Sequence, residues 1–300
     1  MRPDLDNLTL DRLLPQTAVA SLLSLGLLCG LAFAQEPQPQ DVAFVARADG
    51  TTQRYVVLLP PQFDDGQTHD LLLVFHGHGS DRWQFVRQDR DECRVARDVA
   101  AAHRMILVSP DYRARTSWMG PRAEADVIQI IAEVKAKHRI GKTVLCGGSM
   151  GGTASLTFAA LHPELVAGAV SMNGTANLLE YEQFQDAIRE SFGGTKAEIP
   201  EEYKRRSAEY WPERLTMPIG ATTGGKDTLV PPDSVLRLAA VLKKIGREVL
   251  VVHRPDGGHS TNYADGKAVL EFVLQRVKAA GPSSAVSAEG AAKAEGVVKK

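Results

Sequence analysis

Hydrophobic positions in this chain fall into two kinds of segment, short continuous apolar runs and longer stretches with a helical period. The run from Leu71 to Phe75 is apolar at every position, which predicts a strand buried on both faces. The stretch 124–138 has apolar residues at i, i+3, i+4 and i+7, the period of an amphipathic helix. Such runs and periods alternate along most of the chain. This alternation predicts an α/β fold with a mostly parallel, doubly wound sheet.

The expected elements extend from residue 42 to residue 278, which we interpret as one domain. Strands are expected at residues 42–47, 54–59, 71–75, 105–109, 143–146, 166–172, 218–223 and 248–253, and helices at 82–103, 124–138, from Ser149 to before His162, at 233–245 and at 262–278. Residues 174–214 break the alternation, because they are polar and helical in character with scattered aromatic side chains. They predict a helical cap inserted above the carboxyl edge of the sheet.

The two ends of the chain differ in composition from the part between them. An apolar run ends in an A-x-A cleavage site at Ala32 to Ala34, so residues 1–34 are predicted to be a secretory signal peptide. The run is about as long as a minimal membrane span, and an uncleaved membrane anchor is the alternative. Residues 35–41 are expected to form a polar linker. The composition of residues 279–300, without periodicity, predicts a disordered tail.

Composition and charge narrow the classes of partner and cofactor. The 300 residues are 44% hydrophobic, enough for a sizeable core, and carry a net charge of -1. Because the folded part has no basic run, nucleic acid is not expected as a partner. No pair among Cys29, Cys93 and Cys146 has metal-ligand spacing, and Cys93 and Cys146 are expected to be free and buried. His76-x-His78 lacks a third ligand with suitable spacing, so we expect no metal and no cofactor.

The most informative stretch is Gly147-Gly148-Ser149-Met150-Gly151, between an apolar run and a helical pattern. A G-x-S-x-G sequence in this position is typical of a nucleophile elbow, a sharp and strained turn that exposes the serine hydroxyl. Side chains at the flanking glycines would crowd that turn. The following helix offers free N–H groups and a positive dipole to an oxyanion. Ser149 is therefore the predicted nucleophile.

A serine nucleophile needs a base to take its proton and an acid to orient that base, and in this architecture they follow it in the order acid, then histidine. Of the two histidines in the last part of the chain, His253 lies within a strand pattern and His259 in the loop beyond it. His259 is therefore the predicted base. Asp227 follows the preceding strand and is the predicted acid. Asp233 fits a helix N-terminus better, and Asp256 is too close in sequence to His259 to bond its ring easily.

The negative charge that develops on a substrate in acyl transfer needs two N–H donors. One is expected from the backbone of Met150, directly after the nucleophile. The other is expected from the loop after the apolar run at 71–75, where we prefer the backbone of His78 and place Gly77 next.

The loop after the strand at 105–109 offers side chains that could bind substrate, because such loops border the site in open α/β sheets. The indole of Trp118 could stack on a sugar or aryl ring. Arg113, Arg115 and Arg122 could bind an acidic group such as a uronate. The alternatives are a packed tryptophan and solvated arginines.

The elbow, the HG-x-G loop at 76–79, the G-x-x-D-x-x-V-P segment at 224–231 and the GGH at 257–259 together resemble the α/β-hydrolase superfamily over about residues 50–278. Within it, the chain is similar to secreted esterases of the feruloyl esterase and polyhydroxybutyrate depolymerase-like group. It is also similar to the prolyl oligopeptidase-type catalytic domain, above all from Tyr203 to Pro231. The resemblance implies the α/β-hydrolase fold.

The same resemblance implies Ser149 as nucleophile, Asp227 as acid and His259 as base. The expected function is that of a secreted or periplasmic serine hydrolase, which cleaves polysaccharide esters or other short acyl esters through an acyl-enzyme. No recognisable peptidase propeller precedes the domain, which argues against peptide cleavage. A serine peptidase and a non-catalytic binding protein are the alternatives, and acyl transfer to an alcohol also stays open. Membrane contact is expected only if the leader is uncleaved.

Overall fold

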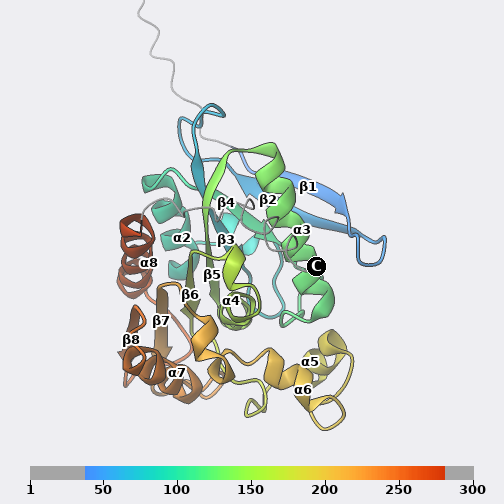
Figure 1. The fold of residues 1–300 in the computed structure, drawn as a ribbon, viewed down its shortest axis with the longest axis vertical. Helices are drawn as coiled ribbons and strands as arrows, with labels where there is room; N and C mark the ends of the chain where they lie inside the picture. Colours follow the sequence, from blue (N-terminus) through green and yellow to red (C-terminus); the bar gives the residue numbers. More distant parts are fainter. Residues whose placement is uncertain (1–37, 281–300) are drawn as a thin grey trace, which may run out of the picture. The chain divides into compact units, whose positions relative to one another are not determined.

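The computed structural model describes residues 38–280 around a single eight-stranded sheet, with the strand order β1-β2-β4-β3-β5-β6-β7-β8 (Figure 1). The predicted signal peptide with Cys29, residues 35–37 of the predicted linker and the tail beyond residue 280 lie outside the described residues. β1 pairs antiparallel with β2, and β2 antiparallel with β4; every other pair is parallel. This confirms the predicted, mostly parallel α/β sheet. The strands are β1 (Gln40–Val45), β2 (Thr52–Leu58), β3 (His69–Phe75), β4 (Ile106–Pro110), β5 (Ile140–Gly148), β6 (Gly168–Met172), β7 (Ile219–Gly224) and β8 (Val249–Arg254).

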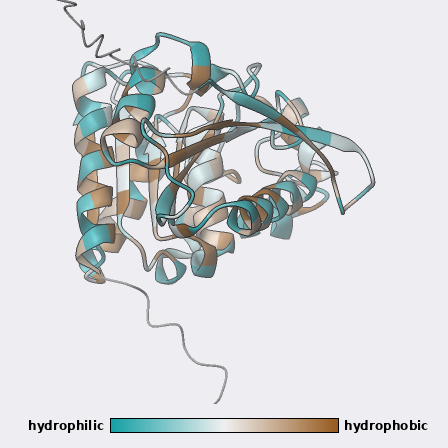
Figure 2. Ribbon diagram, turned by 90° about the horizontal axis from the view of Figure 1, so that it is seen from above, coloured by the Kyte–Doolittle hydropathy of each residue, from teal (hydrophilic) through white to brown (hydrophobic). Residues whose placement is uncertain are grey.

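Helices cover both faces of the sheet (Figure 1). α2 (Asp91–Ala102) and α8 (Tyr263–Ala279) pack on one face, and α3 (Pro121–Lys137), α4 (Met150–Leu161) and α7 (Asp233–Lys244) pack on the other. Figure 2 shows that the inner strands are mainly hydrophobic, whereas the helices carry both hydrophobic and hydrophilic positions. The sheet is therefore a middle layer that both sets of helices keep from water.

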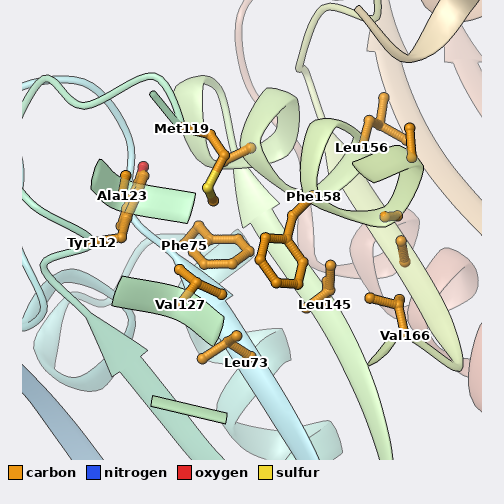
Figure 3. Close-up of a cluster of buried hydrophobic side chains, with 14 of the residues drawn as sticks. Leu73, Phe75, Tyr112, Met119, Ala123, Val127, Leu145, Leu156, Phe158 and Val166 are labelled. Carbon is orange, nitrogen blue, oxygen red and sulfur yellow. The ribbon is translucent and has the colours of Figure 1, made fainter. Parts of the chain in front are cut away.

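The continuous apolar run of β3 supplies both layers of the core. Leu73 and Phe75 belong to the cluster on the side of α3 and α4, and Leu72 and Val74 belong to the cluster beneath α2 and α8, because successive side chains of a strand point to opposite faces. Figure 3 shows Phe75 facing Phe158 of α4 in the first cluster. Each of these side chains is fully buried, which stabilises the fold by roughly 1.5–3 kcal/mol apiece.

The order of the central strands determines where a ligand site can form. β3 pairs with β4 on one side and with β5 on the other, so the chain crosses over β3 between β4 and β5. In an open α/β sheet, the crevice beyond the carboxyl ends of the strands at such a crossing is where ligands bind. The loop after β3 and the turn after β5 lie side by side at this crevice.

The single helix predicted over residues 82–103 is wrong, because the structure has two helices there. α1 (Gln84–Arg87) ends at Gln88, whose backbone is extended, and Arg90 is also extended before α2 begins. The stretch between them is polar and offers no side chain to the core. The guanidinium of Arg97 donates to two carbonyl oxygens at the end of α1 and holds the break in place.

The chain between β6 and β7 is the segment predicted to be a cap. It contains α5 (Gln185–Phe192), α6 (Pro200–Arg205) and two short 3-10 turns, η2 (Ala208–Tyr210) and η3 (Pro212–Arg214); another turn, η1 (Pro163–Leu165), follows α4. The fully buried guanidinium of Arg206 attaches this segment to α3 through Glu124, at 2.7 Å. Burial alone would raise the pKa of Glu124, but hydrogen bonds from His162, Arg205 and Arg206 lower it to about 2.

Two further sequence features can be compared with the structure. Cys93 and Cys146 are both free and buried, as predicted, and burial raises the pKa of the Cys93 thiol to about 12. Between residues 38 and 280, no helix is both long enough and apolar enough to cross a bilayer.

Candidate active site

Ser149 stands at the turn between β5 and α4 in a strained backbone conformation, with φ 57° and ψ −122°. The glycines around it are required by close contacts. A Cβ at Gly147 would collide with the backbone of Gly151, and one at Gly151 would collide with the carbonyl of Phe75. The strained turn predicted from the G-x-S-x-G spacing is therefore present, and positive φ at a non-glycine residue is a cost that local packing must hold in place.

A chain of hydrogen bonds joins Ser149 to a buried carboxylate. The hydroxyl of Ser149 lies 2.8 Å from Nε2 of His259, and Nδ1 of His259 lies 2.7 Å from Oδ2 of Asp227. The other carboxylate oxygen accepts the backbone N–H groups of Leu229 and Val230, at 3.0 and 2.9 Å. Because a carboxylate can only accept, the neutral ring of His259 carries its proton on Nδ1. Nε2 is then free to accept the proton of Ser149.

The loops that carry the acid and the histidine are joined through their backbones. The N–H of Gly225 donates to the carbonyl of Arg254 at 2.8 Å, and that of Lys226 to Gly257, also at 2.8 Å. Gly224 packs so closely on Gly257 that a side chain there would collide with its carbonyl. This close approach of two loops after neighbouring strands fixes where Asp227 and His259 meet.

The competing residues lie elsewhere. Asp256 is paired with Lys226 at 2.7 Å and its side chain is 89% exposed. Asp233 is the first residue of α7, as expected for a helix N-terminus. His253 lies within β8 and bonds the hydroxyl of Thr223. Of the aspartates and histidines weighed from the sequence, the structure brings only Asp227 and His259 to Ser149.

Of the three backbone amides expected to form an oxyanion hole, two are free to bind a substrate oxygen and one already has a hydrogen-bond acceptor. Met150 is the first residue of α4, and in the described part of the chain neither its N–H nor that of His78 has a hydrogen-bond acceptor. The N–H of Gly77, in contrast, donates to Oε1 of Gln84 at 2.7 Å. Gly77 is therefore wrong as a donor to substrate in this structure. Gln84, which no sequence motif marks, holds that amide and leaves His78 as the available donor.

Trp118 does not stack on substrate, because its side chain is fully buried and does not line the cavity at Ser149. Its backbone N–H contacts the sulfur of Met150 at 3.4 Å, and its indole N–H donates to Nδ1 of His78 at 3.2 Å. The prediction of a stacking platform is therefore wrong. The indole packs against Tyr181 and Phe184, and Trp118 contacts both residues whose amides are free, His78 through the indole and Met150 through its backbone N–H.

The same contact defines the state of the His78 ring. An indole N–H can only donate, so Nδ1 of His78 accepts and the neutral ring carries its proton on Nε2. Partial burial lowers the pKa of His78, which favours this neutral form. His78 therefore presents a neutral side chain to the cavity.

A cavity of about 410 Å³ opens in front of Ser149. Its apolar surface comes from Met172, Phe184 and Leu229, and its charged side chains, apart from histidine, are Arg90, Glu92 and Arg115. The remaining lining is mostly polar or glycine: Gly77, His78, Gly79, Ser80, Gln84, Gln88, Gly148, Ser149, Asn173, His259, Ser260 and Thr261. This volume suits a small substrate or the end of a larger one.

The structure separates the three arginines expected at the substrate, and Arg122 lines a different cavity. Arg113 does not reach the cavity, because its guanidinium is held by Asp49 at 2.9 Å and Asp126 at 2.8 Å. Asp126 is almost completely buried, and burial raises its pKa to about 6, so it needs a cation beside it. The prediction for Arg113 is wrong for this reason, whereas Arg115 does line the cavity.

Between residues 38 and 280, no three His, Cys, Asp or Glu side chains are arranged to hold a metal ion. Both ring nitrogens of His76 lie near backbone carbonyls, those of Gly77 and Asp111, and burial lowers the pKa of this ring.

The sequence of residues 113–278, more than half of the chain, matches the model of the prolyl oligopeptidase family. The chain belongs to this family. As a member of the prolyl oligopeptidase family with an α/β-hydrolase sheet, it is a serine hydrolase. The matched range contains Ser149, Asp227 and His259 but begins after the loop that carries His78. No curated protein is significantly similar to the chain in sequence.

Solved structures of several hydrolases share the fold of this family member. FphF of Staphylococcus aureus, a fluorophosphonate-binding serine hydrolase, is 17% identical with a TM-score of 0.63, over 80% of this chain and 98% of that one. A ferulic acid esterase is 16% identical with a TM-score of 0.63, over 80% and 98%. An acylaminoacyl peptidase of Pyrococcus horikoshii is 15% identical with a TM-score of 0.63, over 82% of this chain and 43% of that one. At these identities the likeness establishes the fold alone.

Proposed function

We propose that this protein hydrolyses carboxylic esters through an acyl-enzyme formed on Ser149. The observation that carries the proposal is the unbroken chain of hydrogen bonds from the Ser149 hydroxyl through His259 to the buried carboxylate of Asp227. In this arrangement His259 is the base and Asp227 the acid that orients it. Nothing about folding requires these three side chains to meet at a strained turn beside a cavity, which argues against a non-catalytic binding protein.

The first half-reaction follows from the geometry. Nε2 of His259 takes the proton of Ser149 as its oxygen attacks the ester carbonyl, and Asp227 stabilises the imidazolium that forms. The carbonyl oxygen becomes an oxyanion, and the free amides of Met150 and His78 are the donors placed to receive it. The positive end of α4 adds to this stabilisation. His259 then gives the proton to the departing alcohol, which leaves an acyl group on Ser149.

The second half-reaction reverses these roles with water. His259 takes a proton from water as the water attacks the acyl group, and it returns that proton to the Ser149 oxygen when the acid leaves. The two amides again hold the oxyanion. An alcohol in place of water would give acyl transfer by the same route.

One observation favours an ester over a peptide bond. A solved structure that this chain covers almost from end to end is named as a ferulic acid esterase. The chain spans less than half the length of the acylaminoacyl peptidase structures that share its fold. Peptide hydrolysis is the second candidate, because the family model that matches residues 113–278 is named for an oligopeptidase.

We also propose that the protein is exported. The apolar run from Thr17 to Ala34 and its A-x-A end support a cleaved signal peptide, so that the mature chain begins at Gln35.

The experiment that tests the proposed function compares the wild type with Ser149→Ala on three substrates: p-nitrophenyl acetate, methyl ferulate and an Ala-Pro anilide. Ester turnover should exceed anilide turnover in the wild type. It should fall by several orders of magnitude in Ser149→Ala with an unchanged melting temperature, because the three side chains act as a unit. Unchanged turnover of p-nitrophenyl acetate in Ser149→Ala would refute Ser149 as the nucleophile. Turnover of the anilide alone by the wild type would favour the peptidase.

A further inference from the structure

The charges around the cavity at Ser149 are unequal. Glu92 is the only carboxylate among the residues that line it, and Arg90 neutralises this group at 2.7 Å. Arg115 has no such partner, since in residues 38–280 no carboxylate lies within ion-pair distance of its guanidinium. His78 favours its neutral form. The cavity therefore holds one uncompensated positive charge.

Arg115 is also held in place beside the candidate oxyanion donors. Its carbonyl accepts the N–H of Gly79 at 2.8 Å, and its Nε donates to the carbonyl of the same residue, also at 2.8 Å. Gly79 directly follows His78. This pair of bonds uses Nε and leaves the two terminal amino groups of the guanidinium without an acceptor among the described residues. Those two groups form the edge that binds a carboxylate in a bidentate way.

The neighbouring arginines, in contrast to Arg115, have carboxylate partners. Arg113 in the same loop is neutralised by two aspartates, and Arg122 contacts Asp49 and lines a separate cavity. A sphere of the volume of the cavity at Ser149 would be about 9 Å across, the scale of one small substrate. A molecule in it can therefore reach both Ser149 and Arg115.

We infer that Arg115 binds a carboxylate on the substrate, so that the preferred esters are those of dicarboxylic acids or hydroxy acids that keep one free carboxylate. The inference rests on the proposed function, because it takes this cavity as the substrate site. The carboxylate replaces water on the two free amino groups, and the anchor at Gly79 fixes its distance from the oxyanion donors. A neutral ester gains nothing from this contact.

A kinetic test uses pairs of esters in which one carboxylate is free in one member and methylated in the other, and rates are compared for the ester bond that the two members share. Monomethyl glutarate and dimethyl glutarate place the charge on the acyl side, and O-acetylglycolate and its methyl ester place it on the alcohol side. The wild type should prefer the charged member of at least one pair by about tenfold in kcat/KM, and salt should weaken this preference. Arg115→Gln should abolish the preference, Arg115→Lys should keep part of it, and the matched control Arg122→Gln should leave it unchanged. A preference that survives Arg115→Gln, or no preference in either pair, would overturn the inference.

A binding test separates this inference from the proposed function. Glutarate itself should bind to the Ser149→Ala protein in calorimetry, and the added Arg115→Gln change should weaken that binding about tenfold, whereas Arg122→Gln should not. Glutarate binding through Arg115 without any ester turnover would support the anion site and refute the esterase. Ester turnover would support the esterase, and the anion site would be refuted if glutarate then failed to bind or bound equally well without Arg115.

Discussion

Replacing Asp227 with asparagine changes the charge of the buried acid while keeping its shape, and the structure dictates how the new amide must lie. Oδ1 of Asp227 accepts two backbone N–H groups, from Leu229 and Val230. The amide oxygen of asparagine must take this place, because its NH₂ group cannot accept. The NH₂ group then faces Nδ1 of His259, which must accept instead of donate. The proton moves to Nε2, and His259 can no longer accept the proton of Ser149.

The size of the effect follows from the distances. With Nδ1 and Oδ2 2.7 Å apart, the centres of an imidazolium and a carboxylate lie about 4 Å apart, which corresponds to about 4 kcal/mol at an effective dielectric constant of about 20. The side chain of Asp227 is fully buried, so water does not replace this attraction. Losing about 4 kcal/mol of stabilisation slows the reaction about 10³-fold, and the wrong tautomer adds to this. We expect kcat to fall about 10³–10⁴-fold for Asp227→Asn, with little change in KM.

The assay is the hydrolysis of p-nitrophenyl acetate, with the melting temperature measured on the same samples to show that the variant is folded. Asp256→Asn is the matched control, because Asp256 belongs to the same pair of loops but is exposed and paired with Lys226. It should lose less than about tenfold, as should Asp233→Asn. If Asp256→Asn were the crippling change and Asp227→Asn stayed active, the acid would be on the wrong loop and the reasoning above would fail.

Three further outcomes are expected. Trp118→Phe removes the indole N–H that donates to the ring of His78, so kcat for p-nitrophenyl acetate should fall about tenfold with KM nearly unchanged. A rise in KM larger than the fall in kcat would indicate that Trp118 contacts the substrate. Glu124→Gln should lower the stability by roughly 2–3 kcal/mol at pH 7 in urea unfolding, because Arg206 loses a buried partner. The pKa of Glu124 is about 2 in the folded protein, below its unfolded value, so its contribution to stability is present above about pH 4.5 and is lost as the pH falls towards 2. Glu124→Gln should lack this acid dependence. Parallel acid unfolding curves for the wild type and the variant would contradict the lowered pKa of Glu124. N-terminal sequencing of exported protein should begin at Gln35, whereas a chain that still begins at Met1 would indicate an anchor.

Ser149, Asp227 and His259 lie far apart in the sequence, yet each could be predicted from it. Ser149 is marked by a local pattern, because a strand, a tight glycine-flanked turn and a helix must follow one another for such a turn to form. Asp227 and His259 are marked by position, since each follows a strand in the last part of the chain. The carboxyl ends of neighbouring parallel strands lie at one edge of the sheet, so loops that are separate in sequence meet there. The hydrogen bonds from Ser149 to His259 and from His259 to Asp227 could therefore be anticipated.

The side chains around them could not be predicted in the same way. Arg113 and Arg115 are two residues apart in one irregular loop, where no period fixes direction; Arg113 turns to the buried Asp126, and Arg115 turns to Gly79. Trp118 is fully buried against Tyr181 and Phe184. Gln84, the first residue of α1, accepts the N–H of Gly77. In each case the decision depends on contacts between segments that the local pattern does not encode.

The sequence by itself determined the alternation of strands and helices, the continuous burial of β3, and the strained turn at Ser149, because periodicity and glycine spacing are local properties. The order of the strands, with β3 between β4 and β5, brings the loop of His78 beside that turn, and it depends on pairing between strands that are distant in sequence. Only the tertiary structure decided that the amides of Met150 and His78 stay free, that Trp118 packs beside them and that Arg115 lines the cavity. These depend on whether a polar group finds a partner inside the fold, and a buried polar group takes the nearest one that the packing offers.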